Sequence, residues 1–354
     1  MSMARDILEV TTRRTALSML AAVVVCVLLP ADSLAQTTGS FSRVGFGARG
    51  LGMANALIAD ASGAASPYYN PALAPFVSSQ QISASAALMT LDRELQYLEF
   101  ATPLRPKAGV AVGLTHAGVS GIDGRDNSGF HTEDLATDEY AFFVAFGLHV
   151  SDRVAAGIGL QLFRSDLYVG LNPVRTVGLD LGVTALITDD LRVGIVMDDL
   201  LARYSWNSSG VFGANGKTTS DKFPRRLRAG FSWNLPVGWA RVLGEYEARF
   251  STVEERSRSV EVSGGVPTEV ITGTEIMVFD SQARLGAEAV VAEGIAVRAG
   301  ADRIGYNGGA GIAPSAGFSV RQPVGNVTVE GAYAFVLEPA AVGSINIITL
   351  KLFL

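Results

Sequence analysis

Apolar side chains recur at every second position along most of this chain, and this alternation limits the folds that it can adopt. The segment 140–150 is the clearest example, because Tyr140, Phe142 and Val144 fall on one face of an extended strand and Ala141 and Phe143 fall on the other. Alternation of this kind is typical of β-strands. We count about fourteen such segments between residues 80 and 354.

Composition narrows the environment in which these strands can lie. The chain is 48% hydrophobic and only 18% charged, which is apolar for a soluble protein. Beyond the N-terminus, however, no run of about 18 residues is free of charged and polar side chains, so no membrane helix is predicted. Two classes remain: a large soluble all-β domain, or a membrane barrel whose apolar residues are spread over alternate positions.

The N-terminus indicates export. Arg13 and Arg14 precede an apolar run at residues 16–29, and small residues follow at 33–35. We therefore predict that residues 1–35 form a signal peptide, by either the general secretory or the twin-arginine route. The only cysteine of the chain lies within it, so no disulfide is expected in the exported protein.

The connections between the predicted strands alternate between long and short. Long polar connections fall at 119–138, 205–221 and 251–280, and tight turns fall between them, at 103–106, 151–153, 188–190, 235–238, 292–294 and 322–325. Bacterial outer-membrane barrels have this asymmetry, with short periplasmic turns and long external loops, whereas a soluble sandwich has no reason for it. We therefore predict an all-β fold: a closed antiparallel transmembrane β-barrel of about 14 strands, at residues 80–354, in the bacterial outer membrane.

Charged side chains occupy many positions on the faces that should point into the lumen. Both signs alternate between neighbouring strands, which suits cross-strand ion pairs. They could line a polar conduit or contact a substrate, or they could brace the barrel by pairing; we favour bracing, because structural ion-pair networks are common. The predicted lumen charges are Arg226, Arg228, Arg241, Glu245, Glu247, Arg284, Glu288, Arg298 and Glu330, with Arg192, Asp198, Arg249 and Asp302 on the same faces.

The segment before the first strand has a different character. Residues 45–76 are rich in Gly and Ala, which are poor strand formers. We expect a short helix at 51–59 and a turn at 60–63. The prediction is that residues 36–79 form a hatch, or plug, inside the barrel. Tyr68, Tyr69 and Phe76 either line a path for apolar ligands or pack the plug against the wall.

Motifs for other chemistry are weak. A net charge of −6 argues against nucleic acid as a partner. Residues 45–50 fit G-x-G-x-x-G, but no βαβ pattern surrounds them. The three histidines lack metal-ligand spacing, and the polar stretch 123–129 is better explained as a loop than as a calcium site. No G-x-S-x-G is present. We predict no enzyme, cofactor or metal.

Three short motifs in the plug resemble a known family. Residues 47–56 (GARGLGMANA), 60–62 (DAS) and 69–72 (YNPA) are similar to the N-terminal signature of FadL-like outer-membrane proteins, and above all to their PorV/PorQ branch. The resemblance implies a fourteen-stranded barrel with an N-terminal hatch. Asn55 departs from the family pattern, where a glycine is usual, and Phe353-Leu354 replaces the usual terminal aromatic residue. The hatch residues that the resemblance marks are Gly47, Ala48, Arg49, Gly52, Asp60, Tyr68, Tyr69, Asn70, Pro71 and Ala72.

Two functions follow from the resemblance. FadL-type proteins pass small hydrophobic compounds such as fatty acids by passive diffusion. PorV/PorQ-type barrels instead dock secreted proteins for type IX secretion or surface attachment. In this chain, the loops at 119–138 and 251–280 would form the docking surface. The expected partners are outer-membrane lipid and hydrophobic small molecules or, in the second case, secretion-system proteins.

Overall fold

The computed structural model describes residues 38–354 apart from 63, 65, 264–265, 307–310 and 340–342. The predicted signal peptide at 1–35 therefore lies outside the described residues. No helix in the described part of the chain has both the length and the apolar character needed to cross a membrane.

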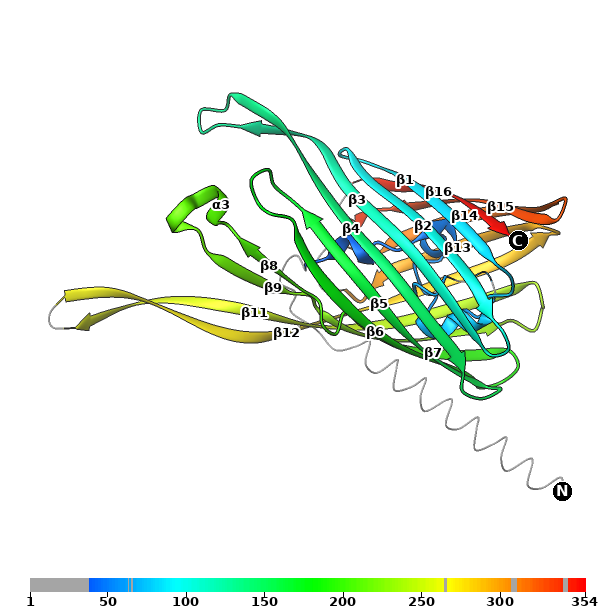
Figure 1. Cartoon of the computed structure of the whole chain (residues 1–354). Helices are drawn as coiled ribbons and strands as arrows, with labels where there is room; N and C mark the ends of the chain where they lie inside the picture. The colour runs from blue at the N-terminus through cyan, green and yellow to red at the C-terminus, as the bar shows by residue number, and fades with distance from the viewer. Residues whose placement is uncertain (1–37, 63, 65, 264–265, 307–310, 340–342) are drawn as a thin grey trace, which may run out of the picture.

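Fourteen antiparallel strands close into a barrel in the described residues, which confirms the predicted fold class (Figure 1). Each strand pairs with its neighbours in the chain, and Gln81 opposite Phe353 begins the β1–β16 pairing that closes the ring. The barrel strands are β1 (Gln81–Met89), β2 (Arg93–Leu104), β3 (Ala108–Arg125), β4 (His131–His149), β5 (Val154–Asp166), β6 (Val174–Leu186), β7 (Leu191–Asp198), β10 (Arg225–Asn234), β11 (Ala240–Ser263), β12 (Val266–Ala292), β13 (Ile295–Ile304), β14 (Ala313–Val324), β15 (Val327–Leu337) and β16 (Ser344–Phe353).

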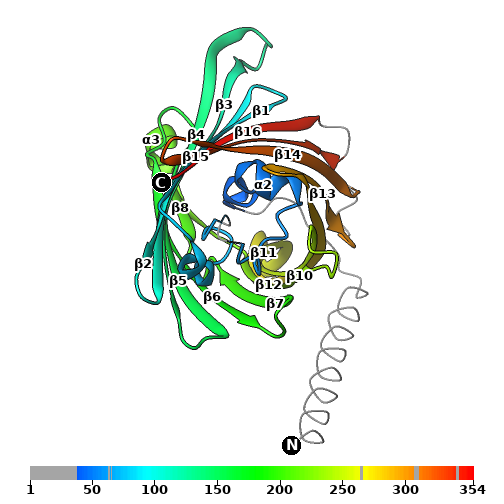
Figure 2. The ribbon, with the colours of Figure 1, turned by 90° about the vertical axis from the view of Figure 1, so that its right-hand side faces the viewer.

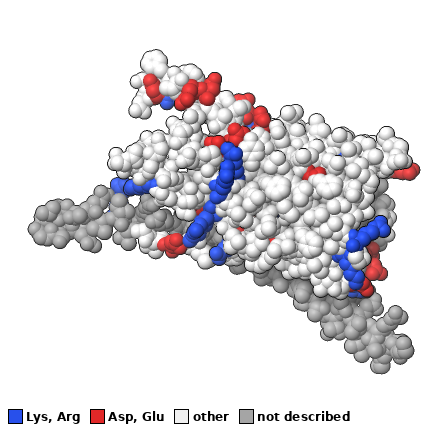
Figure 3. All heavy atoms as spheres, in the orientation of Figure 1, with Lys and Arg blue, Asp and Glu red and all other residues white. Residues whose placement is uncertain are grey.

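The two faces of the wall follow the alternation in the sequence. In β4, Phe142 and Phe146 are exposed on the outer surface, whereas Phe143 and Ala145 are buried inside. The face in Figure 3 carries a broad band with few charged side chains over the strands, and most charges gather at its two margins and on the projecting hairpin. Trp233 and Trp239, beside a short turn, are both about half exposed. This outer surface is suited to lipid.

The long connections contain more regular structure than predicted. Residues 251–280 were expected to be a loop, but β11 and β12 remain paired from Ala240↔Ala289 to Ser263↔Val266. Similarly, β3 and β4 extend through most of 119–138. Both hairpins project beyond the barrel (Figure 1). The prediction of loops was wrong because a two-stranded ribbon in water can carry polar side chains on both faces, and such a sequence looks like that of a loop. The hydrogen bonds between the two backbones are enough to extend the strands there.

The connection between β7 and β10 forms a small cap of its own. It contains β8 (Arg203–Asn207), α3 (Ser209–Phe212), η3 (Gly213–Asn215) and β9 (Thr218–Lys222). The strands β8 and β9 pair only with each other in the described residues. Tyr204 of β8 is buried and Trp206 is half-buried, so these two residues belong to the cap and not to an aromatic girdle of the membrane surface.

The plug lies inside the ring of strands (Figure 2). It contains η1 (Ser40–Arg43), α2 (Gly47–Gly52) and η2 (Pro71–Phe76). The helix predicted at 51–59 was wrong, because α2 starts earlier and the chain turns sharply after it. Ala54 and Asn55 have φ of 53° and 62°, in the left-handed region that ends a helix. Asparagine tolerates this region better than most residues, which explains how it stands in place of glycine.

Candidate functional site: the plugged lumen

A ring of alternating charges joins the plug to one wall of the barrel. Arg49 of α2 contacts Asp60 of the plug and Glu288 of β12, each at 2.6 Å. Arg241 of β11 closes the ring, at 3.1 Å from Asp60 and 3.4 Å from Glu288. We call these four residues the charge ring. Arg298 of β13 approaches Glu288 from outside the ring, at 2.7 Å.

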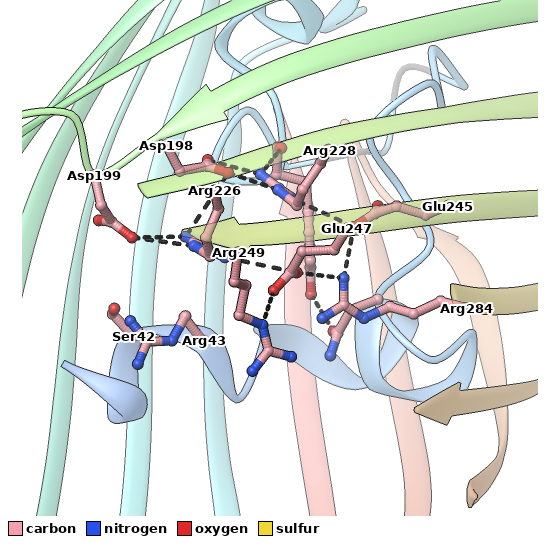
Figure 4. A network of polar contacts seen from close by, with 12 residues as sticks. Ser42, Arg43, Asp198, Asp199, Arg226, Arg228, Glu245, Glu247, Arg249 and Arg284 are labelled. Atoms are coloured by element: carbon pink, nitrogen blue, oxygen red, sulfur yellow. Dashed lines mark hydrogen bonds and ion pairs between the residues drawn. The ribbon is translucent and has the colours of Figure 1, made fainter. Parts of the chain in front are cut away.

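A second ionic network fills the lumen beside the plug, between β7 and β13 (Figure 4). Arg228 holds Asp198 through two hydrogen bonds, of 2.7 and 2.8 Å, and also donates to the Tyr69 carbonyl of the plug. Arg284 bridges Glu245 and Glu247 at 2.7 and 2.8 Å. The remaining pairs are Arg226 with Asp199 at 3.0 Å, Arg249 with Glu247 at 2.5 Å, and Arg284 with Asp302 at 2.9 Å.

All nine predicted lumen charges lie inside the barrel in these two networks or next to them. Glu330 contacts Arg321 at 2.5 Å and lies 3.9 Å from Arg298. Arg192 does not join an ion pair that the described contacts show; its guanidinium lies over the Phe76 ring, 4.5 Å from the centroid. Each carboxylate in the two networks faces at least one arginine, as buried charges require. The arrangement supports the bracing interpretation of these residues.

The opposite wall holds the plug through glycines that the sequence analysis did not single out. Gly109, Gly147, Gly157 and Gly182 face inward on β3 to β6, and consecutive members are register partners. A Cβ on any of them would overlap plug atoms of Asn70, Pro71, Ala72 or Ala74. We call these four residues the glycine seat. The sequence did contain a signal for the glycine seat, because a glycine stands at an inward position in each of four neighbouring strands.

Asn70 organises the plug segment that rests on this seat. Its side chain is fully buried; it accepts from the Ala72 amide at 2.9 Å and donates to the Ile58 carbonyl at 2.7 Å. The first of these bonds caps η2, which begins at Pro71. Asn70, Pro71 and Ala72 of the predicted hatch motif therefore meet the glycine seat directly. Three other members of that motif meet the far wall: the Ala48 amide donates to Thr349 at 2.8 Å, Gly47 faces Thr349, and Gly52 faces Ala334.

The aromatic residues of the plug pack; they do not line an open path. The Tyr69 hydroxyl lies 2.8 Å from the Phe46 amide and 2.8 Å from Asn55 Oδ1. Tyr68 makes edge contacts with Phe46 and Phe143, with ring centroids at 4.1 and 5.5 Å, and its hydroxyl donates to the Ser42 carbonyl. Phe76 lies at the short-turn end of the barrel, against His149 with centroids 4.7 Å apart.

Two cavities beside the plug are small. One of about 30 Å³ is lined by residues that include Tyr68, Arg226, Arg228 and Glu247. Such a volume has room for about two water molecules. A second cavity, of about 10 Å³, lies near Pro71, Gly159 and Asp180. Neither cavity is wide enough for the path for apolar ligands that Tyr68, Tyr69 and Phe76 could line, and Asn70 is fully buried.

Apolar surface is found instead at the end of the barrel opposite the short turns. Phe41, Phe163, Tyr204 and Phe223 form a buried cluster beneath the cap. Outside it, the β5–β6 loop touches α3, since a Cβ on Gly170 would lie 3.6 Å from the Val211 side chain. The exposed apolar residues of these two segments, which we call the rim patch, are Leu167, Tyr168, Val169, Val211 and Phe212.

The described residues contain no group of three or more His, Cys, Asp or Glu side chains placed to hold a metal ion. Asp123, in the polar stretch at 123–129, pairs with Arg125 and His131 at 2.5 and 2.7 Å. His116 pairs with Asp138 at 2.7 Å.

Comparison with known proteins relates the fold to channels for hydrophobic compounds. No family model matches the sequence, and no curated protein matches it. Among solved structures, the toluene transporter TbuX of Ralstonia pickettii is similar, with a TM-score of 0.55 and 14% identity over 87% of this chain and 97% of that one. The toluene transporter TodX of Pseudomonas putida has a TM-score of 0.52 and 12% identity over 80% and 91%.

A third similar structure is a FadL homologue of Pseudomonas aeruginosa, with a TM-score of 0.53 and 10% identity over 86% of this chain and 97% of that one. The likeness to all three structures extends over nearly their full length. At such low identity the likeness establishes the fold, which is that of the FadL-type structures, and it does not test the resemblance to the PorV/PorQ branch.

Proposed function

We propose that this chain is an outer-membrane channel through which small hydrophobic compounds diffuse passively. The observation that carries the proposal is the rim patch. Val169 is 67% exposed and Phe212 is 64% exposed, at the end of the barrel predicted to face the exterior. Clustered apolar side chains in water mark sites where apolar molecules adsorb. Beneath them lies the aromatic cluster of Phe163, Tyr204 and Phe223.

The order of layers along the barrel supports this function. A ligand that adsorbs on the rim patch would meet the aromatic cluster next, where ring faces and edges suit acyl chains and monoaromatic rings. The ionic network and the plug follow, and they exclude apolar molecules while the plug is seated. The similar structures include two toluene transporters, which makes a small apolar solute the natural class to test.

The test is uptake by protein-containing vesicles that carry lipopolysaccharide in the outer leaflet, since plain phospholipid bilayers dissolve apolar solutes. We expect the protein to raise the uptake of a labelled fatty acid or monoaromatic hydrocarbon. The double variant Val169→Asp/Phe212→Asp should lower the rate about tenfold, because the ligand would have to displace hydrated carboxylates. Phe130→Asp is the matched control, since Phe130 is equally exposed on the separate β3–β4 hairpin. Uptake equal to protein-free vesicles would refute the proposal.

A second candidate function, docking of secreted proteins in the manner of the PorV/PorQ branch, is favoured by the projecting hairpins. A membrane span needs about 9–11 residues per strand, but β11 has 24 and β12 has 27. Immobilised protein should then capture type IX secretion cargo, and deletion of 255–275 should abolish capture. Absence of hydrocarbon uptake together with cargo capture would select this function over the first.

A further inference from the structure

The outer surface of β3–β6 changes from apolar to polar within one step along the strands. The exposed apolar residues of one row are successive register partners: Leu114, Phe142, Leu162 and Val177. Two residues further from the short turns, on the same outer face, the register partners are His116, Tyr140, Arg164 and Arg175. We call Arg164 and Arg175 the outer arginine pair.

The outer arginine pair lies where the membrane should end. From Val154 at the short-turn end of β5 to Arg164, the strand has the length of about 9–11 residues that a membrane crossing needs. Tyr140, the register partner of Arg164, stands where tyrosine gathers in membrane proteins, at the level of the lipid headgroups. In Figure 3 basic side chains form a stripe along the margin of the apolar band on the side of the projecting hairpins.

The two guanidinium groups repel each other. Directly opposite residues of an antiparallel pair have Cβ atoms about 4.5–5.5 Å apart, and like charges in that position destabilise the sheet. Arg164 has one acidic neighbour, Asp166, at 3.9 Å, and both side chains are about half exposed. Within the described part of the chain, Arg175 has no ion pair. The carboxylate of Asp138 is already paired with His116, at 2.7 Å. The outer arginine pair therefore carries positive charge that its neighbours do not balance.

From this arrangement we infer that the outer arginine pair binds the phosphate group of a lipid in the outer leaflet, whose acyl chains lie along Leu162 and Val177. A guanidinium matches phosphate through two parallel hydrogen bonds, and a phosphate between two arginines also removes their mutual repulsion. Leu162 is 52% exposed and Val177 is 44% exposed, directly beside the pair on the same strands.

The apolar row favours a lipid over free phosphate as the ligand. Free phosphate would gain only the charge contacts, whereas a phosphorylated lipid gains these contacts and also covers the apolar side chains beside them. The outer arginine pair lies on the outside of the barrel, so the inference does not depend on transport through the lumen. Failure of hydrocarbon uptake would refute the proposed function and leave this inference to its own test.

The first experiment measures binding to the purified protein in detergent by native mass spectrometry. The probes are lipid A, which is the phosphorylated lipid part of lipopolysaccharide, lipid A from which the phosphates have been removed enzymatically, and inorganic phosphate. We expect the unaltered protein to retain lipid A, and Arg164→Gln/Arg175→Gln to weaken this binding about tenfold. Arg153→Gln is the matched control, because Arg153 is an exposed arginine in the short turn before β5. It should bind lipid A like the unaltered protein.

Three outcomes would overturn the inference. Equal binding of lipid A by the double variant would show that the outer arginine pair makes no contact with it. Equally tight binding of dephosphorylated lipid A would remove the phosphate from the contact. Inorganic phosphate that displaces lipid A at equal concentration would show that the pair holds free phosphate without need of the lipid.

The second experiment separates lipid binding from a purely structural role. Without lipid A, Arg175→Gln should be at least as heat-stable as the unaltered protein, because it relieves the repulsion from Arg164. Added lipid A should raise the unfolding temperature of the unaltered protein and raise that of the variant less, since a ligand stabilises the state that binds it. A variant that is less stable already without lipid A, or that gains as much from lipid A as the unaltered protein, would contradict the inference.

Discussion

The two faces of the plug pack on the barrel wall with partly different chemistry. Toward β3–β6, the wall residues are glycines and the plug backbone lies directly on the strands. Toward β11–β13, Gly286 and Gly300 also admit the plug backbone, at Met53 and Ala54. On this second face, ion pairs between plug and wall, as between Arg49 and Glu288, are added to the backbone contacts. Close packing fixes how near the plug and the wall approach, whereas the ion pairs fix which charged residues face each other.

The largest expected effect comes from the ionic face. Asp60→Asn removes the only carboxylate of the plug in the charge ring, and it leaves Arg49 and Arg241 with one fewer partner each. Loss of one member of a buried ion pair typically costs about 3–5 kcal/mol. Urea unfolding in lipid vesicles, followed by tryptophan fluorescence, should show this loss. Asp189→Asn, in an exposed short turn, should leave the unfolding midpoint where it is.

A methyl group at the glycine seat should have the next largest effect. In Gly157→Ala the new Cβ would overlap Pro71 and lie 2.5 Å from the Ala72 amide nitrogen, and backbone cannot move aside cheaply. Overpacking of this kind costs about 1–3 kcal/mol. The same unfolding assay applies, with Gly331→Ala as control, because a Cβ there meets no atom within 4 Å. If the two variants were equally stable, close packing at the glycine seat would not be what holds this face of the plug.

A substitution of Asn70 tests whether the plug segment on the glycine seat needs the hydrogen bonds that Asn70 makes within the plug. Asn70→Ala deletes the cap of η2 and leaves the Ile58 carbonyl without its donor, which should destabilise the protein by about 1–2 kcal/mol. In a protein that carries Ala74→Cys, a buried site of the plug, Asn70→Ala should also accelerate reaction of the cysteine with a water-soluble maleimide. Ser78→Ala, at an exposed neighbouring position of the plug, should change neither quantity.

The smallest effect is expected at the start of α2. Thr349→Val keeps the shape of the side chain but removes the acceptor for the Ala48 amide, at a cost of about 1 kcal/mol. Thr349→Ser retains the hydroxyl and should behave like the unaltered protein in the unfolding assay. A loss as large as that of Asp60→Asn would mean that a neutral hydrogen bond to β16 stabilises the plug as much as the charge ring does.

Local patterns were sufficient for the wall of the barrel. Alternation along single strands indicated the closed sheet, and the inward positions of Arg228, Glu247 and Glu288 followed from counting residues in steps of two. The regular alternation of short turns and long connections along the chain indicated that the two ends of the barrel differ. These features are set within one strand or one hairpin, so the amino-acid sequence alone determined them.

Only the tertiary structure decided which residues meet across the lumen. Arg49 and Glu288 are far apart in the chain, and so are Pro71 and Gly157, and nothing local to either partner specifies the contact. The same holds for the exit from α2, where the side chain of Asn55 reaches Val44 and Tyr69. Strand periodicity fixes the face on which a side chain lies, but the closure of the sheet around the plug fixes its partner.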